Sequence, residues 1–298
     1  MKIPHDHQFE PVGIASKAEI ASRFRNSGYR LCEYSFAIQV CWHNFNDSCW
    51  TVIDDWLFLR YRENNHLRFI CPVGKGDLNE AIEACFDYLR SHGHPPIIRF
   101  VPDEQARFLD RSRFSLVQDS NNSDYMYKTS DMATFAGKKY SKKRNQIAQF
   151  MRAGDWSVEP VASQQRQAIN EFLKRWCKER ECEGHEVLEH EMHALATCLD
   201  NIEALDLSGI VLKGAQGEII GLSIGGQLTK DTWVTHFEKA MTCRPGSYLV
   251  LTRECARRIP KEIQWVDREQ DMGEPNLRKA KEQLMPDHMS LSWAVVPG

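Results

Sequence analysis

The sequence predicts an α/β protein that has two domains or one duplicated unit. The chain has 298 residues, about twice the ~150 residues that are typical of one domain. Hydrophobic residues make up 42% and charged residues 27% of it, a balance that is typical of globular proteins and excludes wholesale disorder. Both halves are predicted to run in the order strands, helix, strand, helix and strand, although no letter-for-letter repeat connects them.

The first half is predicted to begin with a helix over residues 15–26 and to continue as an antiparallel sheet. The segments WTVIDDWLFLRY and HLRFICPV are rich in β-branched and aromatic residues, and the polar break at 63–65 between them is typical of a hairpin loop. Apolar residues spaced at helical intervals predict a helix over 77–91. The remaining predicted elements are the strand PIIRFVP, the short helix EQARFL, and the strands FSLVQD and SDYMYKT.

The second half is predicted to begin with two helices, over 164–180 and about 189–199, because their apolar residues share one face. A meander of three strands follows, GIVLKG, EIIGLSIGGQL and TWVTHFEKA. The hydroxyl of Ser247 can cap the next helix, which is predicted to end near Arg258. The last predicted elements are the strand IQWVD, a helix over 275–284 that starts with proline, and the strand MSLSWAVV.

The domain boundary is predicted near 129–138, where polar residues and a charge run replace apolar alternation. The predicted domains are 1–132 and 133–298. The polar N-terminus lacks the apolar core of a secretory signal, and no apolar stretch reaches the ~18 residues of a membrane span. Together with ten cysteines in a long chain, these features favour a cytoplasmic protein with reduced thiols.

A basic cluster opens the second half. The net charge of the chain is −3, which excludes a uniformly basic nucleic-acid coat, yet five of the seven residues from Lys138 to Arg144 are basic. On a helix, Tyr140, Ile147 and Met151 would form the inner face, and the lysines would form two lines of like charge that a bound anion would relieve. The cluster therefore predicts a phosphate-binding surface, and the alternative is a solvated basic helix face.

Two further segments carry polar residues that are suited to chemistry. Strand alternation in TWVTHFEKA places His236 and Glu238 on one face, where they could act as base and orienting group. The alternative is a polar surface stripe of an antiparallel sheet. In DREQDMGEPNLRKAKEQLMP, Asp271 follows a predicted strand and precedes a glycine turn, which is a common position for ligand-binding residues in α/β sheets.

Other motifs point to specific sites less clearly. In CRPGSYLV, which starts at Cys243, Gly246 and Ser247 begin a helix in a way that suits a pyrophosphate, although an ordinary turn and cap look the same. No Walker A sequence and no GxSxG motif occurs. No metal site is predicted, because zinc-protease spacings are absent from the segment that contains Cys177, Cys182, His185, His190 and His193.

Three motifs in the same order resemble a known bacterial family. They are Gly137-Lys138-Lys139-Tyr140 with Lys142-Lys143-Arg144-Asn145, then His236-Phe237-Glu238-Lys239, then Asp271-Met272-Gly273 with Leu277-Arg278-Lys279-Ala280. Nearly the whole chain resembles the family grouped with the C-terminal domain of phosphatidylglycerol lysyltransferase. This resemblance implies an α/β (α+β) fold of two GNAT-like (acyl-CoA N-acyltransferase-like) domains, each a mixed, mainly antiparallel sheet flanked by helices, akin to Fem-type peptidyltransferases that use aminoacyl-tRNA.

The resemblance implies an acyl- or aminoacyltransferase that needs no further cofactor and takes its acyl group from aminoacyl-tRNA or from acyl-CoA. The acceptor would be an amine or a hydroxyl, and membrane-bound relatives use the glycerol hydroxyl of a lipid. Two other functions remain: a CoA-dependent N-acetyltransferase and a non-catalytic module that binds tRNA or phosphate. The implied catalytic residues are Glu238, His236 and Asp271; the donor-binding residues are Lys138, Lys139, Lys142, Lys143, Arg144, Asn145, Gly246 and Ser247; and the substrate-binding residues are Lys239, Gly273 and Arg278.

Overall fold

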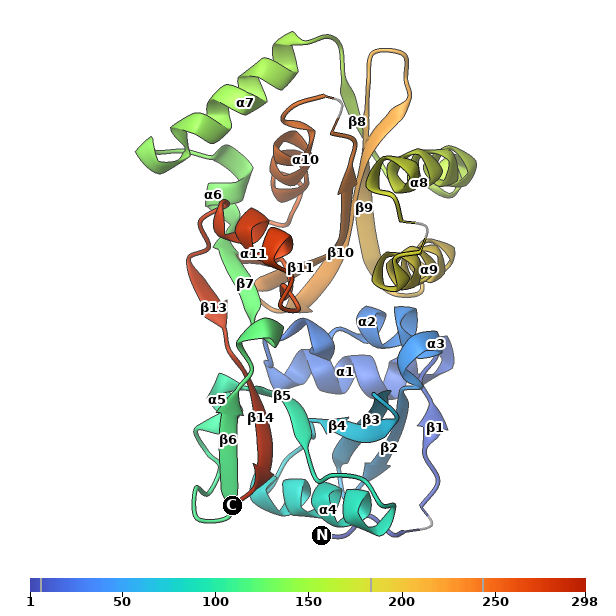
Figure 1. Cartoon of the computed structure of the whole chain (residues 1–298), viewed down its shortest axis with the longest axis vertical. Helices are drawn as coiled ribbons and strands as arrows, with labels where there is room; N and C mark the ends of the chain where they lie inside the picture. The colour runs from blue at the N-terminus through green and yellow to red at the C-terminus, as the bar shows by residue number, and fades with distance from the viewer. Residues whose placement is uncertain (6, 183, 243) are drawn as a thin grey trace. The chain divides into compact units, whose positions relative to one another are not determined.

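The computed structural model describes residues 1–5, 7–182, 184–242 and 244–298. The chain divides into two compact units (Figure 1). Unit 1 comprises Met1–Tyr125, Leu228–Lys230 and Glu269–Gly298, and unit 2 comprises Met126–Gln227 and Asp231–Arg268. Each unit is described by itself.

Unit 1 is built on a seven-stranded sheet in the order β1-β2-β3-β4-β5-β14-β6. β4 and β5 are parallel, whereas the other neighbours in this sheet pair antiparallel. The sheet is therefore mixed and mainly antiparallel, as predicted. Its strands are β1 (Glu10–Pro11), β2 (Cys49–Ile53), β3 (Trp56–Glu63), β4 (His66–Ile70), β5 (Ile98–Pro102), β6 (Phe114–Gln118) and β14 (Ser292–Pro297).

The helix predicted over 77–91 is α4 (Leu78–Ser91) of unit 1. Its apolar stripe is buried, and the side chain of Asp77 accepts a hydrogen bond from the backbone N–H of Asn79 at 2.8 Å, which caps the first turn. The other elements of unit 1 are η1 (Ile14–Ser16), α1 (Lys17–Ser27), η2 (Cys32–Tyr34), α2 (Phe36–Cys41), α3 (His43–Asn46), α5 (Asp103–Ala106), η3 (Ser120–Asn122), α11 (Pro275–Glu282) and β13 (His288–Ser290).

The sheet of unit 2 includes six strands in the order β7-β12-β11-β10-β9-β8. β11 and β12 are parallel, while β7–β12, β9–β10 and β8–β9 are antiparallel pairs. This arrangement matches that of unit 1, in which one parallel pair interrupts an antiparallel sheet. The strands are β7 (Asp124–Lys128), β8 (Ser157–Pro160), β9 (Leu207–Lys213), β10 (Ile219–Thr229), β11 (Thr232–Ala240) and β12 (Trp265–Asp267).

Helices cover both faces of the unit 2 sheet. Lys239 of β11 contacts residues of α8 and α9, whereas its neighbour Glu238 bonds Thr252 of α10. Because consecutive strand residues point to opposite faces, α8 and α9 lie on one face and α10 on the other (Figure 1). The helices of unit 2 are α6 (Thr129–Thr134), η4 (Lys138–Tyr140), α7 (Ser141–Arg152), η5 (Ser163–Gln165), α8 (Arg166–Arg180), α9 (Glu186–Asp200) and α10 (Ser247–Ala256).

The inner face of α7 differs in one position from the prediction. Tyr140 and Ile147 are 0% and 4% exposed, as expected for an inner face. Met151 is 45% exposed, so its placement on that face was wrong. It lies at the second-last position of α7, and its sulfur contacts the guanidinium of Arg253 at 3.8 Å.

Each sheet contains a strand from the other half of the chain. The C-terminal strand β14 lies between β5 and β6 in unit 1, and β7, from the first half, pairs with β12 in unit 2. The predicted division into 1–132 and 133–298 places β14 in the second domain, whereas the structure places it in unit 1. The difference arises because a strand's hydrophobic pattern specifies that it pairs but not with which strand.

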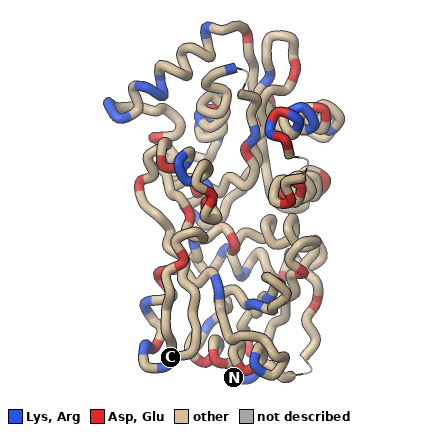
Figure 2. The backbone as a smooth tube through the Cα atoms, viewed as in Figure 1, with Lys and Arg blue, Asp and Glu red and all other residues tan. Residues whose placement is uncertain are grey.

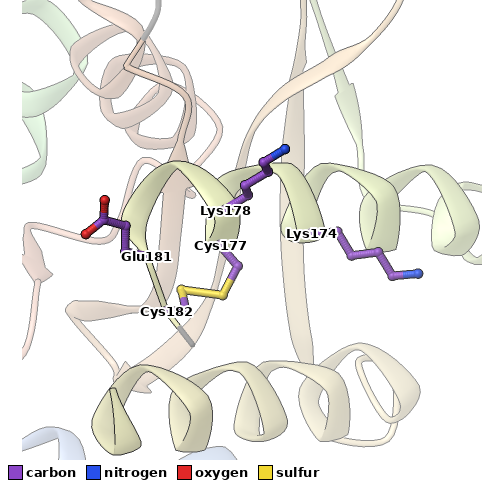
Figure 3. Close-up of a pocket in the computed structure, with 5 residues that line it drawn as sticks. All are labelled: Lys174, Cys177, Lys178, Glu181 and Cys182. Carbon is purple, nitrogen blue, oxygen red and sulfur yellow. A yellow bond between two sulfur atoms is a disulfide. The ribbon is translucent and has the colours of Figure 1, made fainter. Parts of the chain in front are cut away.

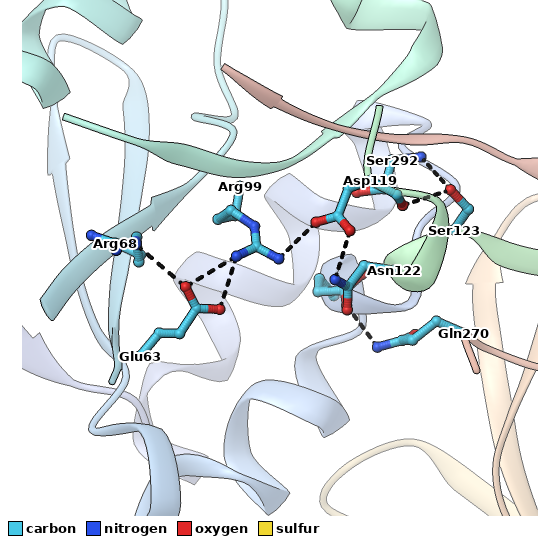
Figure 4. Close-up of polar contacts among 9 residues, drawn as sticks. Glu63, Arg68, Arg99, Asp119, Asn122, Ser123, Gln270 and Ser292 are labelled. Atoms are coloured by element: carbon cyan, nitrogen blue, oxygen red, sulfur yellow. Dashed lines mark hydrogen bonds and ion pairs between the residues drawn. The ribbon is translucent and has the colours of Figure 1, made fainter. Parts of the chain in front are cut away.

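Side-chain contacts hold β14 in the sheet of unit 1 (Figure 4). The backbone N–H of Ser292 donates to the hydroxyl of Ser123 at 3.1 Å, and that hydroxyl donates to the carbonyl of Asp119 at 3.0 Å. The carboxylate of Asp119 in turn accepts from Arg99 of β5 at 2.6 Å. Polar contacts thus tie the start of β14 to the turn after β6 and to β5.

No helix of the described residues is long and apolar enough to cross a membrane.

We expect residues 1–132 alone not to form the sheet of unit 1, because β5 and β6 are joined only through β14, which this fragment lacks. The surface that buries Val295 of β14 in the full chain would also be exposed to water. Circular dichroism and amide dispersion in NMR spectra of this fragment measure its folding. The full chain is the control. Cooperative thermal unfolding of the fragment, with native-like dispersion, would contradict the conclusion that the sheet of unit 1 needs β14.

Candidate functional site

The parallel strands β11 and β12 of unit 2 pair only over a short stretch, and the point where β12 ends beside the longer β11 is called the divergence of the two strands. Their register pairs are Thr232 with Trp265, Trp233 with Val266 and Val234 with Asp267. β12 ends at Asp267, whereas β11 continues to Ala240. The last six residues of β11 therefore have no register partner in β12. Their peptide groups on the edge that faces away from β10 can face a ligand.

Glu238 forms a buried ion pair at this divergence. Its Oε1 accepts from Nη2 of Arg268 at 2.8 Å and its Oε2 accepts from Nη1 at 3.1 Å. The hydroxyl of Thr252 on α10 donates to the same carboxylate at 2.9 Å. The side chains of Glu238 and Arg268 are only 7% and 15% exposed, so the pair is shielded from water and its geometry is set by three hydrogen bonds.

The ion pair limits the chemistry that Glu238 can perform. Burial by itself would lower the pKa of Arg268, but the nearby carboxylate of Glu238 outweighs burial and raises this pKa above its usual value. Both carboxylate oxygens of Glu238 already accept hydrogen bonds from Arg268, and Thr252 donates to one of them. Glu238 therefore fits an orienting role better than proton removal.

His236 is the other titratable residue that strand alternation places on the same face of β11 as Glu238. It is 7% exposed. Lys239, which was predicted to bind substrate, lies on the opposite face. Its ammonium is 2.5 Å from Oε2 of Glu191 on α9 and 4.3 Å from the ring centre of Trp176 on α8. This placement joins the two helices to the sheet.

The predicted basic cluster lies along η4 and α7, at the surface of unit 2, and Figure 2 shows Lys and Arg along this helix. Lys139 forms an ion pair of 2.9 Å with Asp131, and Arg144 donates to two backbone carbonyls at 2.6 Å. Within the part of the chain that the structure describes, Lys138, Lys142 and Lys143 have no acidic partner. Partial burial lowers the pKa of Lys143. Asn145 is exposed beside them.

The turn that begins α10 is covered by α7. A Cβ atom on Gly246 would lie 2.7 Å from the carbonyl oxygen of Gln146, so the backbone of α7 packs directly on this turn. The Ser247 hydroxyl donates to the carbonyl of Arg244 at 2.6 Å, so its proton is used within the turn. Cys243, the first residue of the predicted pyrophosphate motif, lies outside the described residues.

Arg244 is also used within unit 2. Its guanidinium donates to the carbonyls of Phe150, Gly154 and Asp155 at 2.7–3.2 Å and lies 3.9 Å from the ring centre of Phe150. The carbonyl of Phe150 lies in the last turn of α7 and the other two follow the helix, so the cation is placed where it stabilises the C-terminal end. Arg244 is the arginine of the segment CRPGSYLV, and it is therefore used to cap α7.

Asp271 belongs to unit 1, not to the unit that holds Glu238. Its carboxylate is 1% exposed and accepts from the hydroxyl of Tyr125 at 2.6 Å, from Nε and Nη2 of Arg278 at 2.8 and 2.9 Å, and from the N–H of Gly273 at 2.8 Å. Burial would raise the pKa of Asp271, but these donors outweigh it and lower the pKa to about 2. Asp271, Gly273 and Arg278 thus form one hydrogen-bonded turn, in which both carboxylate oxygens of Asp271 accept hydrogen bonds.

Sequence reasoning missed Arg268 and Thr252. Arg268 directly follows the strand IQWVD. The available signal was a basic residue at the end of a strand that could lie beside the strand of Glu238. Thr252 lies one turn and a half into α10, and only the packing of this helix on the sheet identifies it as a partner of Glu238.

The cysteines at the end of α8 differ from the expectation of reduced thiols. Cys177 and Cys182 form a disulfide, beside a shallow pocket that Lys174, Lys178 and Glu181 also line (Figure 3). The expectation was therefore wrong for these two residues. Seven other cysteines of the described residues take part in no disulfide.

The fold and site define a class of protein. Two sheets, each with a parallel pair of strands among antiparallel pairs, form a tandem GNAT-like α/β fold. The crystal structure of FemX has a TM-score of 0.57 at 8% identity and covers 99% of this chain and 96% of its own. The fold class predicted from the motifs is confirmed.

The family follows from two further comparisons. The family model described as phosphatidylglycerol lysyltransferase, C-terminal, matches residues 24–295, so the chain belongs to this family, as predicted. A conserved protein of unknown function from Bacteroides thetaiotaomicron VPI-5482 is 30% identical, with a TM-score of 0.91, and the match covers 97% of this chain and 99% of that one.

A more distant structure shares the fold. The C-terminal domain (DUF2156) of a putative lysylphosphatidylglycerol synthetase from Agrobacterium fabrum has a TM-score of 0.64 at 13% identity, and the match covers 94% of this chain and 92% of that one. No curated protein matches the chain.

We expect Asp271→Asn to lower the melting temperature at pH 7 by about 5 °C, because the amide pairs less well with Arg278. The folded pKa of Asp271 lies below its unfolded value, so the stabilisation is complete above about pH 5. It is lost as the pH falls from about 4 towards about 2, and the difference between the wild type and the variant should shrink over that range. Thermal unfolding monitored from pH 7 to pH 2.5 measures it, and a difference independent of pH would contradict this role.

Proposed function

We propose that the protein is an aminoacyltransferase that moves an amino acid from aminoacyl-tRNA to an amine or hydroxyl acceptor at the divergence of β11 and β12. The observation that carries this proposal is the run of exposed lysines on η4 and α7 in the same unit. α7 packs on α10, whose Thr252 bonds Glu238. One helix thus connects a phosphate-binding surface to the buried ion pair.

The donor is inferred from how the anion-binding groups are arranged. A CoA pyrophosphate binds where a helix N-terminus is open, since free N–H groups and the helix dipole attract it. The turn that begins α10 is packed against α7, and Arg244 is committed elsewhere. Lysine side chains on a surface helix suit a nucleic-acid backbone, which they position without reading its sequence. These features favour tRNA over CoA.

The reaction needs no cofactor in its bond changes. The acceptor nitrogen or oxygen attacks the ester carbonyl of aminoacyl-tRNA, the new C–N or C–O bond forms, and the ester C–O bond to the ribose breaks. The proton of the acceptor is transferred, through His236, to the departing ribose oxygen. Peptide N–H groups of β11 beyond Val234 can stabilise the oxyanion, because β12 supplies no partner there.

The buried ion pair fixes the position of the Glu238 carboxylate in the proposed site. Arg268 holds Glu238 so that its carboxylate can orient the acceptor without leaving its own position. The family description names phosphatidylglycerol lysyltransferase, which supports a lipid headgroup hydroxyl as one acceptor of this class. An amine acceptor is the alternative, and the site as described accommodates either chemistry.

We expect the double substitution Lys138→Ala, Lys142→Ala to weaken binding of charged tRNA about tenfold at ~0.1 M salt, because two phosphate contacts are lost. The slope of log K against log salt concentration should fall by about 1.5. Filter binding across a salt series measures both. The matched control is Lys174→Ala, Lys178→Ala, which removes two exposed lysines with the same spacing on α8. Equal losses in both double variants would contradict a specific surface on α7.

The competing functions predict different results in the same samples. A CoA-dependent N-acetyltransferase would bind acetyl-CoA in calorimetry and leave charged tRNA intact. A non-catalytic module would bind uncharged tRNA with the same salt dependence and would not speed the release of labelled amino acid to any acceptor. The proposal requires acceptor-dependent loss of amino acid from charged tRNA.

We expect His236→Asn to lower the single-turnover rate of amino acid transfer about 100-fold, because the variant has no group to carry the proton. Binding of charged tRNA should change less than twofold, since the lysines of α7 are untouched. Rapid quench with labelled aminoacyl-tRNA measures the rate, and circular dichroism checks the fold. A rate equal to that of the wild type would exclude His236 from proton transfer.

A further inference from the structure

Unit 1 contains a buried group of three side chains that the proposed reaction does not use. Cys32 and Glu33 belong to η2, and Asp124 is the first residue of β7. The Sγ atom and one carboxylate oxygen from each acidic residue all lie within 4.8 Å of one another. Cys32, Glu33 and Asp124 are 2%, 6% and 0% exposed, so the group is closed to solvent.

The contacts within the group leave a buried oxygen of Glu33 without a hydrogen bond. The N–H of Cys32 donates to Oδ2 of Asp124 at 2.7 Å, and Nε2 of Gln270 donates to Oε1 of Glu33 at 3.1 Å. Oε2 of Glu33 has no hydrogen-bond partner. A buried polar atom without a partner is costly and calls for a ligand, an ion or a proton.

The charge of the group points to a cation. Two carboxyl groups are buried together here, and taking carboxylates out of water without compensation is unfavourable. Either the two carboxyl groups share a proton or a positive ion balances them.

We propose that Cys32, Glu33 and Asp124 bind one divalent metal ion of the zinc type. Zinc bonds of about 2.0–2.3 Å to sulfur and oxygen place tetrahedral ligands roughly 3.5 Å apart, which side-chain adjustments within this group satisfy. Oε1 of Gln270, which lies 2.9 Å from Sγ of Cys32, is the fourth ligand. On binding, the thiol proton of Cys32 and the carboxyl proton leave for solvent.

The ligand set selects the kind of metal and its role. Thiolate sulfur favours zinc and similar transition metals, whereas magnesium and calcium prefer ligand sets made entirely of oxygen. A site with four protein ligands and no opening to solvent is structural. The ion would fasten η2 to the start of β7 and to the 269–270 segment, whose carbonyls already accept hydrogen bonds from Lys281 at 2.9 and 2.7 Å.

The test uses Co²⁺ as a spectroscopic probe in the full chain, purified from cells grown in cobalt-supplemented medium because the site is buried. We expect one equivalent of bound Co²⁺ and a sulfur-to-cobalt charge-transfer band in the near ultraviolet. The band should be absent from protein purified from cells grown in zinc-supplemented medium. Cys32→Ser should lose the band. Cys41→Ser, which alters another buried cysteine of unit 1, should keep it.

The outcomes separate a metal from a shared proton. Absence of the band in the wild type, or its persistence in Cys32→Ser, would overturn the proposal. If Cys32→Ser does not fold, Glu33→Gln takes its place and should weaken Co²⁺ binding while the sulfur band remains. Unchanged binding in Glu33→Gln would overturn the proposal as well. Activity is not needed as a readout, so failure of the transferase proposal leaves this test intact.

Discussion

The ion pair between Glu238 and Arg268 is the constraint on which the site of unit 2 depends. β12 ends at Asp267, so Arg268 is the first residue released from the sheet, and it bonds the carboxylate of the longer strand. A buried ion pair of this kind costs about 3–5 kcal/mol to break by removing one partner. The two strands are therefore joined by parallel pairing up to Val234 and Asp267, and by the side chains of Glu238 and Arg268 beyond that point.

The positive charge at the surface of this unit lies on side chains and not at the N-terminus of α10. α7 packs on the turn before α10, and Arg244 donates to a carbonyl at the C-terminal end of α7. The N-terminus of α10 and the C-terminus of α7 are therefore both used for packing. The lysines of η4 and α7 then supply the positive charge at the surface. Side-chain charges at a surface act over a Debye length and weaken with salt. This arrangement suits a large polyanion better than a compact pyrophosphate.

Local patterns predicted the elements that depend on neighbouring residues. α4 and α8 follow from apolar spacing, and the family and fold class follow from motifs centred on Lys138, Glu238 and Asp271. Long-range strand pairings could not be predicted from the sequence, because nothing in MSLSWAVV specifies that β14 lies between β5 and β6. The roles predicted for Asp271 and Lys239 were drawn from motifs, whereas hydrogen bonds with Arg278 and an ion pair with Glu191 show that both side chains already have partners.

A double-mutant cycle on Glu238 and Arg268 tests the central claim most directly. The rate of amino acid transfer from charged tRNA is measured in a single turnover for Glu238→Gln, Arg268→Gln and the double variant, each checked for folding. The account predicts that the double variant is no slower than the slower single variant, with a coupling of about 2 kcal/mol, because the two side chains act as one unit. Rates that fall additively, or that equal the wild type, would contradict it.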